Sequence, residues 1–400
     1  MEFVTVAEAA ERMGVSARAI QKWAKSGKIA GAKQIGRSWV IPADAPVPNI
    51  RAKSRTPRVS GKRSAKDKKI HLPFPLMCLP FASGDAQKAV DSITDEDDRA
   101  IALGELYYFS GQYLRSIQQI EPYLQHEDPS LSISANLLYV FDCLGLGRIE
   151  DLHRMVEYIR QRTRRLLSGE ADPVVRGGAI LLDTTVAILL RVPDVDIHRL
   201  EQTMDILPRA LQLFGCYILA YRAYMEQDYH RSCAICRTAL LLGGHHYPLV
   251  GTNLQIMRCV SLMCLREVEE AKYCFNSLWE NAQKDHSIGQ IGEHYLMLLG
   301  LPDLCLKQQK PDEFKQLMEI TKQYYPAWLK IREQIDNAVH ATGLTVTEMN
   351  IAALYNRNWA VKEIAVHMDI SERMVKHHVA MIYEKLGVGS REELRKYTFL

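Results

Sequence analysis

The chain has 400 residues, 47% of them hydrophobic and 24% charged, which is the composition of a folded globular protein with length for about two to four domains. Its longest apolar stretches, near residues 72 and 179, are interrupted by prolines, an aspartate and threonines, so neither predicts a membrane span. No signal-peptide pattern opens the sequence, and nine cysteines are too dilute for a small disulfide scaffold. These features predict a cytoplasmic protein with no membrane association.

Basic residues are concentrated in the first 69 positions, which hold 16 Lys and Arg against 5 Asp and Glu, a balance of +11. Because the whole chain carries +3, the remainder carries −8. A local basic block is typical of a segment that binds a polyanion.

The first 43 residues predict two helices and a β-hairpin. Thr5 and Glu8 have the spacing of a capping box, which opens a helix that runs to Arg12. Ser16 is placed to cap a second helix, which ends near Gly27. The stretch 33–42 has apolar residues on both sides of a Gly-Arg turn and predicts two short strands.

Three strings in this region, TVxEAAExMGVS, WxKSGKI and IGRSWVIP, resemble in their order the excisionase-like, MerR-related winged helix-turn-helix family. The resemblance covers about a tenth of the chain. It implies a DNA-binding face on the second helix, opposite the expected core residues Ile20 and Trp23. Gln and Arg side chains on such a face can read adenine and guanine, although a solvated polar face is the alternative. The candidate contacts are Arg18, Gln21 and Lys22 on the helix, and Lys33 and Arg37 on the hairpin.

Residues 44–72 are expected to form a disordered basic linker. The stretch 44–69 is rich in Pro, Ser, Lys and Arg and lacks aromatic residues, so it has little apolar surface to bury. Residues 51–69 alone hold nine basic residues and one acid. Such a run can lie along phosphates without reading a sequence, or can serve only as a solubilising tether.

Residues 85–340 predict helix after helix, with breaks at 110–112, 145–147, 227–228 and 265–266. Comparable turns recur at spacings near the 34-residue tetratricopeptide period. Leu103-Gly104-x-x-Tyr107 and Ala271-x-x-x-Phe275 match parts of that signature, although no repeat carries all of it. We therefore expect degenerate tetratricopeptide-like helical pairs, with an irregular helical bundle as the alternative. Such a repeat domain could bind a protein or peptide on its concave face or mediate oligomerisation.

The last 60 residues, 341–400, predict a compact helical module. Thr345 and Glu348 form a second capping box, preceded by Leu344 as a possible hydrophobic staple. A short helix follows around residues 362–365, and Ser371 introduces a third. The third helix carries one apolar stripe (Val375, Val379, Ile382 and Leu386) and, on its opposite face, the exposed-type residues Arg373, Lys376, His377, Ala380 and Glu384.

The string LTxxE, then KEIA, then ISExxVKxHVxxIYxKLGV, then RxEL, resembles the LuxR-type helix-turn-helix of bacterial regulators. The resemblance implies a four-helix unit whose third helix enters the major groove and whose fourth, about 390–397, forms a dimer face. Carried over by position, the DNA contacts are Arg373, Lys376, His377 and Ala380. Two residues depart from the pattern. Met374 replaces the usual Thr, which removes a hydroxyl, and Asn358 replaces a turn glycine but tolerates the left-handed backbone.

We find no phosphate-binding loop, nucleophile elbow, HExxH or GxGxxG motif, so the sequence predicts no catalytic residue, no cofactor and no enzyme activity. Cys233 and Cys236, followed by His245 and His246, have ligand chemistry for a metal. Cysteines three positions apart on a repeat helix are better explained as packed thiols, so no metal is expected.

The sequence thus predicts a mainly α protein: a winged helix-turn-helix at 1–43, a basic linker at 44–72, a helical repeat domain at 85–340 and a LuxR-type module at 341–400. The predicted function is that of a homodimeric transcription regulator that binds double-stranded promoter DNA. The alternative is a helical-repeat scaffold with excisionase-like architectural DNA binding.

Overall fold

The computed structural model describes residues 3–13, 17–25, 29–36, 38–43, 45, 71–192, 196–335, 339–340 and 343–398. Its contacts divide the chain into two compact units, residues 1–69 and 70–400. Most of the predicted linker, the expected cap Ser16, the helix end at Gly27 and Arg37 lie outside the described residues. The domain boundaries expected from the sequence stay predictions.

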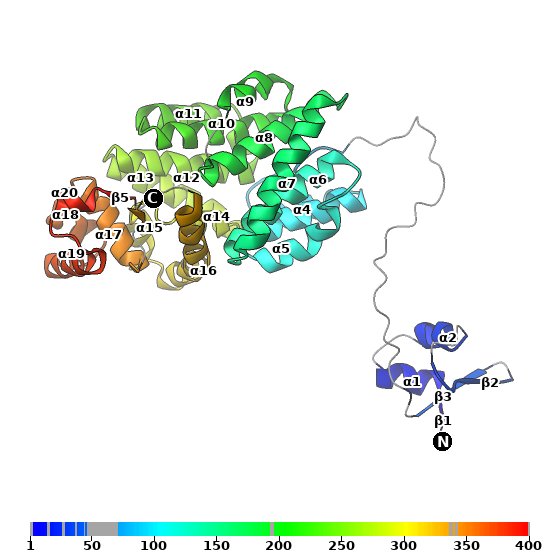
Figure 1. The fold of residues 1–400 in the computed structure, drawn as a ribbon. Helices are drawn as coiled ribbons and strands as arrows, with labels where there is room; N and C mark the ends of the chain where they lie inside the picture. Colours follow the sequence, from blue (N-terminus) through cyan, green and yellow to red (C-terminus); the bar gives the residue numbers. More distant parts are fainter. Residues whose placement is uncertain are drawn as a thin grey trace. The chain divides into compact units, whose positions relative to one another are not determined.

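The first unit contains the predicted helices and hairpin (Figure 1). Helices α1 (Val6–Met13) and α2 (Ala17–Lys25) are followed by strands β2 (Lys33–Ile35) and β3 (Ser38–Pro42). The capping box is confirmed: the Thr5 N–H donates to Glu8 Oε2 at 2.8 Å, and the Glu8 N–H donates to Thr5 Oγ1 at 3.3 Å. A further strand, β1 (Phe3–Thr5), was not predicted.

Strand β1 pairs antiparallel with β3, so the sheet order is β1-β3-β2 and the hairpin is anchored to the start of the chain. The small core contains buried alanine and isoleucine residues, with Trp23 and Trp39 packed against it half-buried. The buried residues are Ala9, Ala10, Ile20, Ala24, Ile29 and Ile41. Both tryptophans are therefore packing residues, as the sequence predicted for Trp23.

The second unit begins with a helical body that extends to α16 (Figure 1). The four predicted breaks lie between consecutive helices that pack on each other. The helices are α3 (Ala86–Ser92), α4 (Glu96–Phe109), α5 (Tyr113–Ile120), α6 (Pro129–Gly145), α7 (Ile149–Ser168), α8 (Pro173–Leu189), α9 (Ile197–Thr203), α10 (Arg209–Met225), α11 (Tyr229–Leu241), α12 (Pro248–Cys264), α13 (Val268–Lys284), α14 (Gly289–Glu293), α15 (Leu301–Leu306) and α16 (Pro311–Ile335). Single 3₁₀ turns lie at Glu121–Tyr123, Met204–Ile206 and Gly244–His246.

The residues of the repeat signature lie at helix contacts. Gly104 on α4 faces Ile120 on α5 so closely that a Cβ atom would collide with the Ile120 side chain. Ala271 and Phe275 on α13 are fully buried. These contacts are those of packed helical pairs, and the tetratricopeptide assignment stays a prediction.

An apolar segment before α3, residues 71–81, is folded into turns and packs into the interior of the body. Phe74 and Leu76 are fully buried, and the Glu105 carboxylate on α4 accepts the N–H groups of Leu76 at 3.0 Å and Met77 at 2.8 Å. The prolines that exclude a membrane helix here permit this irregular path. In the described part of the chain, no helix is long and apolar enough to cross a membrane.

The carboxyl-terminal module contains α17 (Val346–Asn356), α18 (Val361–His367), α19 (Glu372–Leu386) and α20 (Arg391–Leu394). It lies at the end of the body away from α4 and α5 (Figure 1). The fourth helix is a single turn rather than the predicted span of residues 390–397. A short strand, β5 (Tyr397–Thr398), follows it and pairs in parallel with β4 (Val339–His340). The run of helices predicted for residues 85–340 therefore ends in a strand at residues 339–340.

Candidate nucleic-acid interface

Helix α19 presents one buried and one exposed face, as the predicted stripe requires. Val375 and Ile382 are 0% and 1% exposed, whereas Val379 and Leu386 are half-buried. On the other side, the predicted contact residues Arg373, Lys376, His377 and Ala380, together with Glu384, are all exposed. Helix α19 is therefore packed against the module on one face and presents a row of accessible side chains on the other.

Local capping fixes where α19 begins. Ser371 is the N-cap and its hydroxyl accepts the Met374 N–H at 3.2 Å, so Arg373 and Lys376 lie in and just after the first turn. Asn358, in the turn before α18, has φ 63°, the left-handed conformation expected for the position that usually holds glycine. Met374 is 43% exposed and belongs to the same accessible surface.

The module is fastened internally by an ion pair between α17 and α19. Lys385 Nζ lies 2.7 Å from Glu348 Oε2, while the Glu348 carboxylate also accepts the Thr345 N–H that completes the second capping box. Burial raises the pKa of Glu348, but its hydrogen bonds with Lys385 and Thr345 outweigh burial and lower the pKa overall. Lys385 therefore stabilises the packing of α19 on α17 through this ion pair.

The charge of the module is nearly balanced, and several of its cations bond within it. Residues 341–400 hold eight Lys and Arg against seven Asp and Glu. The Arg391 guanidinium stacks 3.6 Å from the centre of the Tyr355 ring and donates to Trp359 O, and Arg395 donates to Asn358 Oδ1 at 2.8 Å. Arg373 and Lys376 are therefore the cations that the exposed face of α19 offers.

The body holds this module through α18 and the turn before it. His367 is 2% exposed and donates from Nε2 to the Leu299 carbonyl at 2.6 Å, and burial lowers the pKa of His367 to about 4, so it is neutral at neutral pH. Gly300 (φ 78°) lies so close to Met368 that a Cβ atom would collide with its sulfur. These contacts leave the α19 face exposed.

Two arginines complete the contact between the body and the module. Arg266, in the α12–α13 turn, donates to the carbonyls of Arg357 at 3.0 Å and Asn358 at 2.8 Å and lies over the Trp359 ring. Burial by itself would lower the pKa of Arg357, but the neighbouring Tyr224, Cys264 and Tyr229 raise it overall. Sequence reasoning missed this contact because its partners are about 60 to 130 positions apart along the chain.

In the first unit the predicted contact face is only partly described. Gln21, Lys22 and Lys25 are exposed on α2, while the side chain of Arg18 and the whole of Arg37 lie outside the described residues. Lys33 on β2 is exposed, with its ammonium 5.5 Å from the centre of the Phe3 ring. The two predicted sets belong to different units of the chain.

Among the described residues, one group of three side chains has ligand atoms close enough for a metal ion: His71, Asp95 and Asp98, all within 4.8 Å of one another. Asp95 is the N-cap of α4 and accepts the N–H groups of Asp97 and Asp98 at 3.0 Å. His71 Nδ1 lies 2.8 Å from Asp98 Oδ1. Helix capping and this hydrogen bond account for the cluster. Cys233 and Cys236 lie on α11, where burial raises the pKa of both thiols.

Two capped helix-turn-helix units, one with a small sheet and one with four helices, define a DNA-binding class of protein. Residues 3–45 match the family model of a helix-turn-helix domain, and residues 342–398 match that of bacterial regulatory proteins of the luxR family. No curated protein and no solved structure gives a significant match. The chain is a DNA-binding regulator with a luxR-family module at its carboxyl end, which points away from an enzyme.

Proposed function

We propose that the chain binds promoters sequence-specifically by placing α19 in the major groove. The observation that supports this most is the exposed row Arg373, Lys376, His377 and Ala380 on a helix whose opposite face is buried. Arg and Lys can reach guanine edges or phosphates from such a helix, and Ala380 allows close approach to a thymine methyl group. The capped amino end of α19 adds a favourable field for phosphate.

The amino-terminal module supplies a second set of contacts: Arg18, Gln21 and Lys22 on α2, with Lys33 and Arg37 on the wing. We take the units as 1–43, 44–72, 85–340 and 341–400, so that the basic segment 44–72 links two DNA readers. Once one reader is bound, the other meets DNA at an effective concentration set by this tether, and two weak contacts combine into a tight one.

A homodimer fits this function, because paired helix-turn-helix modules read two-fold symmetric half-sites about one helical turn apart. Glu392, Glu393 and Arg395 on and next to α20 are exposed and are available for such a contact. The body would then be the part that receives a protein or peptide ligand. A promoter-binding chain of this bacterial type works in the cytoplasm.

Selection of random duplex DNA by the full-length chain tests the proposal. We expect two enriched motifs at a restricted spacing. The variant K376A with H377A should lose one motif, and Q21E should change only the other. The exposed, distant variant K88A serves as the matched control and should return both motifs. Absence of any enriched motif would overturn sequence-specific binding.

Lys376→Ala by itself should weaken binding to all sequences and reduce the salt slope, d log K/d log[salt], by about one unit if its ammonium contacts a phosphate. Fluorescence anisotropy with a labelled duplex, at salt concentrations of about 50 to 300 mM, measures the slope. Because Lys376 is exposed, the substitution should leave thermal unfolding unchanged. An unaltered slope would remove Lys376 from the interface.

Deletion of residues 344–400 separates this function from the alternative, a helical scaffold with architectural DNA binding through the amino-terminal module. Promoter control should be lost while residual DNA assembly by the amino-terminal module persists. Promoter output that survives the deletion would favour the scaffold.

A further inference from the structure

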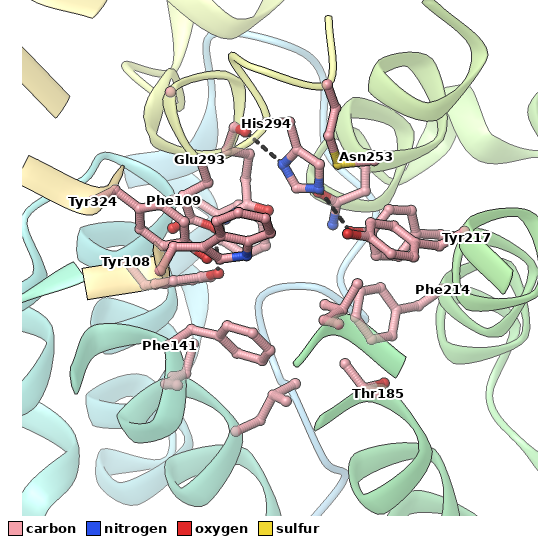
Figure 2. A pocket seen from close by; sticks show the side chains of 18 of the residues that line it. Tyr108, Phe109, Phe141, Thr185, Phe214, Tyr217, Asn253, Glu293, His294 and Tyr324 are labelled. Atoms are coloured by element: carbon pink, nitrogen blue, oxygen red, sulfur yellow. Dashed lines mark hydrogen bonds between the residues drawn. The ribbon is translucent and has the colours of Figure 1, made fainter. Parts of the chain in front are cut away.

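The centre of the body contains a small aromatic cavity, whose walls come from α4, α6, α8, α10, α12, α14 and α16. Tyr108, Phe141, Phe214 and Tyr217 surround it in Figure 2. Its volume is about 80 Å³, which has room for a few water molecules but not for a ligand of ordinary size. The body has a larger hollow at its surface, between α7, α8 and the start of α9.

This second hollow, here called the arginine pocket, has a volume of about 420 Å³. Small-molecule sites commonly measure about 300 to 1,000 Å³, so the pocket is large enough for a small ligand. Its charged side chains are Arg160 and Arg164 on α7, Asp183 on α8, and Asp196 and Arg199 at the start of α9. The pocket is therefore a polar site, unlike the aromatic cavity.

The register of α7 on α8 places Arg160 opposite Asp183. The Thr163 hydroxyl on α7 donates to the Ala179 carbonyl on α8 at 3.4 Å, which makes these two residues neighbours. Helices joined by a short turn run antiparallel, so one turn back along α7 and one turn forward along α8 lead to Arg160 and Asp183. Both charges therefore lie at the same level of the pocket.

The unlike charges of the pocket are not all paired with each other. The Asp183 side chain is half-buried and forms no ion pair or hydrogen bond in the part of the chain that the structure describes. The side chains of Arg160 and Arg164 have no such partner either, whereas Arg199 Nε lies 3.2 Å from Asp196 Oδ2. Burial raises the pKa of Asp183, and the three arginines only partly oppose this effect. Two guanidinium groups and one carboxylate are thus available to an occupant.

Thr184 adds a hydroxyl that the fold does not use. The residue is 5% exposed and lines the pocket, and its side chain makes no hydrogen bond with the described residues. The hydroxyl of the next residue, Thr185, also lacks a partner, but that oxygen is sealed from solvent and the Thr184 oxygen is not. A buried hydroxyl that stays accessible can donate to an occupant and accept from it.

The charges of the pocket define the chemistry of its ligand. Arg guanidinium groups bind carboxylate and phosphate oxygens through paired, charge-assisted hydrogen bonds. A ligand with negative charge alone would be repelled by Asp183, whose ionised carboxylate only accepts hydrogen bonds. A ligand that carries an ammonium group beside its oxyanion satisfies both kinds of side chain.

We propose that the arginine pocket binds a small zwitterionic molecule, which directs a carboxylate or phosphate group to Arg160 and Arg164 and an ammonium group to Asp183. The Thr184 hydroxyl completes the polar contacts of the ligand. The pocket lies outside both DNA-binding modules, so the proposal does not depend on the proposed contacts with DNA.

Calorimetric titration of the full-length chain with O-phospho-L-serine, at constant ionic strength and without DNA, tests the site. This probe carries a phosphate, a carboxylate and an ammonium group, and we expect saturable binding of one probe per chain. The comparison probe 3-phosphoglycerate, in which a hydroxyl replaces the ammonium group, should bind about tenfold more weakly because Asp183 loses its cationic partner. L-Serine, which lacks the phosphate, should bind as well as phosphoserine if the arginines hold the carboxylate, and more weakly if they hold the phosphate.

Two variants assign the roles of the side chains. Arg164→Gln removes an exposed charge of the pocket and should weaken the binding of phosphoserine about tenfold or more. Arg165→Gln is the matched control, because Arg165 is exposed on the same helix but does not line the pocket, and it should bind as tightly as the unaltered chain. Asp183→Asn should reduce the preference for phosphoserine over 3-phosphoglycerate to less than about threefold, a change that a purely structural role would not produce.

Circular dichroism verifies that each variant is folded. Lack of saturable binding of both phosphoserine and L-serine, or equal losses of affinity in Arg164→Gln and Arg165→Gln, would overturn the proposal. A preference for phosphoserine that Asp183→Asn leaves unchanged would contradict the contact between Asp183 and the ammonium group, and with it the zwitterionic ligand.

Discussion

Removal of residues 1–69 should lower the affinity of the chain for its preferred DNA by about a thousandfold near 0.1 M salt and flatten the salt dependence. The segment holds 16 of the 50 Lys and Arg, whereas residues 341–400 have a net charge of only +1. Each phosphate neutralised adds about 0.9 to the salt slope, so four contacts from the segment would contribute about 3.6. At 0.1 M salt, one decade below 1 M, this slope corresponds to more than three decades of affinity.

Anisotropy titrations of one labelled duplex at several salt concentrations measure both quantities. A second variant, in which the nine Lys and Arg of residues 51–69 become Ser or Gln, separates the charge of the run from the helix-turn-helix at its amino end. The sequence preference that we propose for α19 should persist in both. If the slope of the truncated chain equals that of the full chain, residues 1–69 do not lie on the DNA.

Glu105→Ala should reduce the free energy of unfolding by about 3 to 5 kcal/mol. The carboxylate is fully buried and accepts the N–H groups of Leu76 and Met77, which fasten the segment 71–81 across the body. The substitution leaves two buried donors without an acceptor and opens a cavity. Urea unfolding followed by circular dichroism measures the loss. Glu121→Ala, on an exposed turn, should change stability by less than about 0.5 kcal/mol. A small loss for Glu105→Ala would mean that this segment is not held by the carboxylate.

The same carboxyl makes stability depend on pH. Burial raises the pKa of Glu105 and of Glu293 from 4.5 to about 8, so the folded state retains protons that the unfolded chain releases in between. The contribution of these two carboxyl groups to the free energy of unfolding is complete below about pH 4.5 and is lost as pH rises toward 8. His294 and His367, with pKa lowered to about 4, act in the opposite direction only between about 4 and 6.5.

Between pH 6.5 and 8 the carboxyls therefore dominate, and stability should fall by about 2 kcal/mol or more over this interval. Glu105→Gln should remove its part of that fall, since an amide does not titrate. Urea unfolding at about pH 6.5, 7.2 and 8 measures this fall in stability. A flat profile in the unaltered chain would contradict the raised pKa values.

Features set by neighbouring residues could be predicted from the sequence. The capping boxes at Thr5 and Thr345 are formed as their spacing predicted, because both partners lie within one helical turn. Asn358 adopts the left-handed conformation because that preference belongs to its own side chain. The exposed row on α19 follows from helical periodicity, although its contacts with DNA stay predictions.

Contacts between distant parts of the chain could not be predicted. The pairing of β1 with β3 depends on residues almost 40 positions apart. The three residues of β1 are too few to show the alternation of apolar and polar side chains that predicts a strand. The fourth helix of the module ends after one turn, where β5 pairs with β4 instead. In both cases hydrogen bonding to a distant strand decided the local conformation.

The sequence by itself thus determined the two helix-turn-helix modules, the helical body between them and the concentration of positive charge at the amino end, because helix periodicity, capping and charge are local properties. Only the tertiary structure decided that the apolar segment 71–81 packs into the body and is held by Glu105. It also decided that His367 and Arg357 dock the last module against the body. The aromatic cavity likewise exists only once seven helices have packed. Packing brings together residues whose separation along the chain leaves no periodic signal.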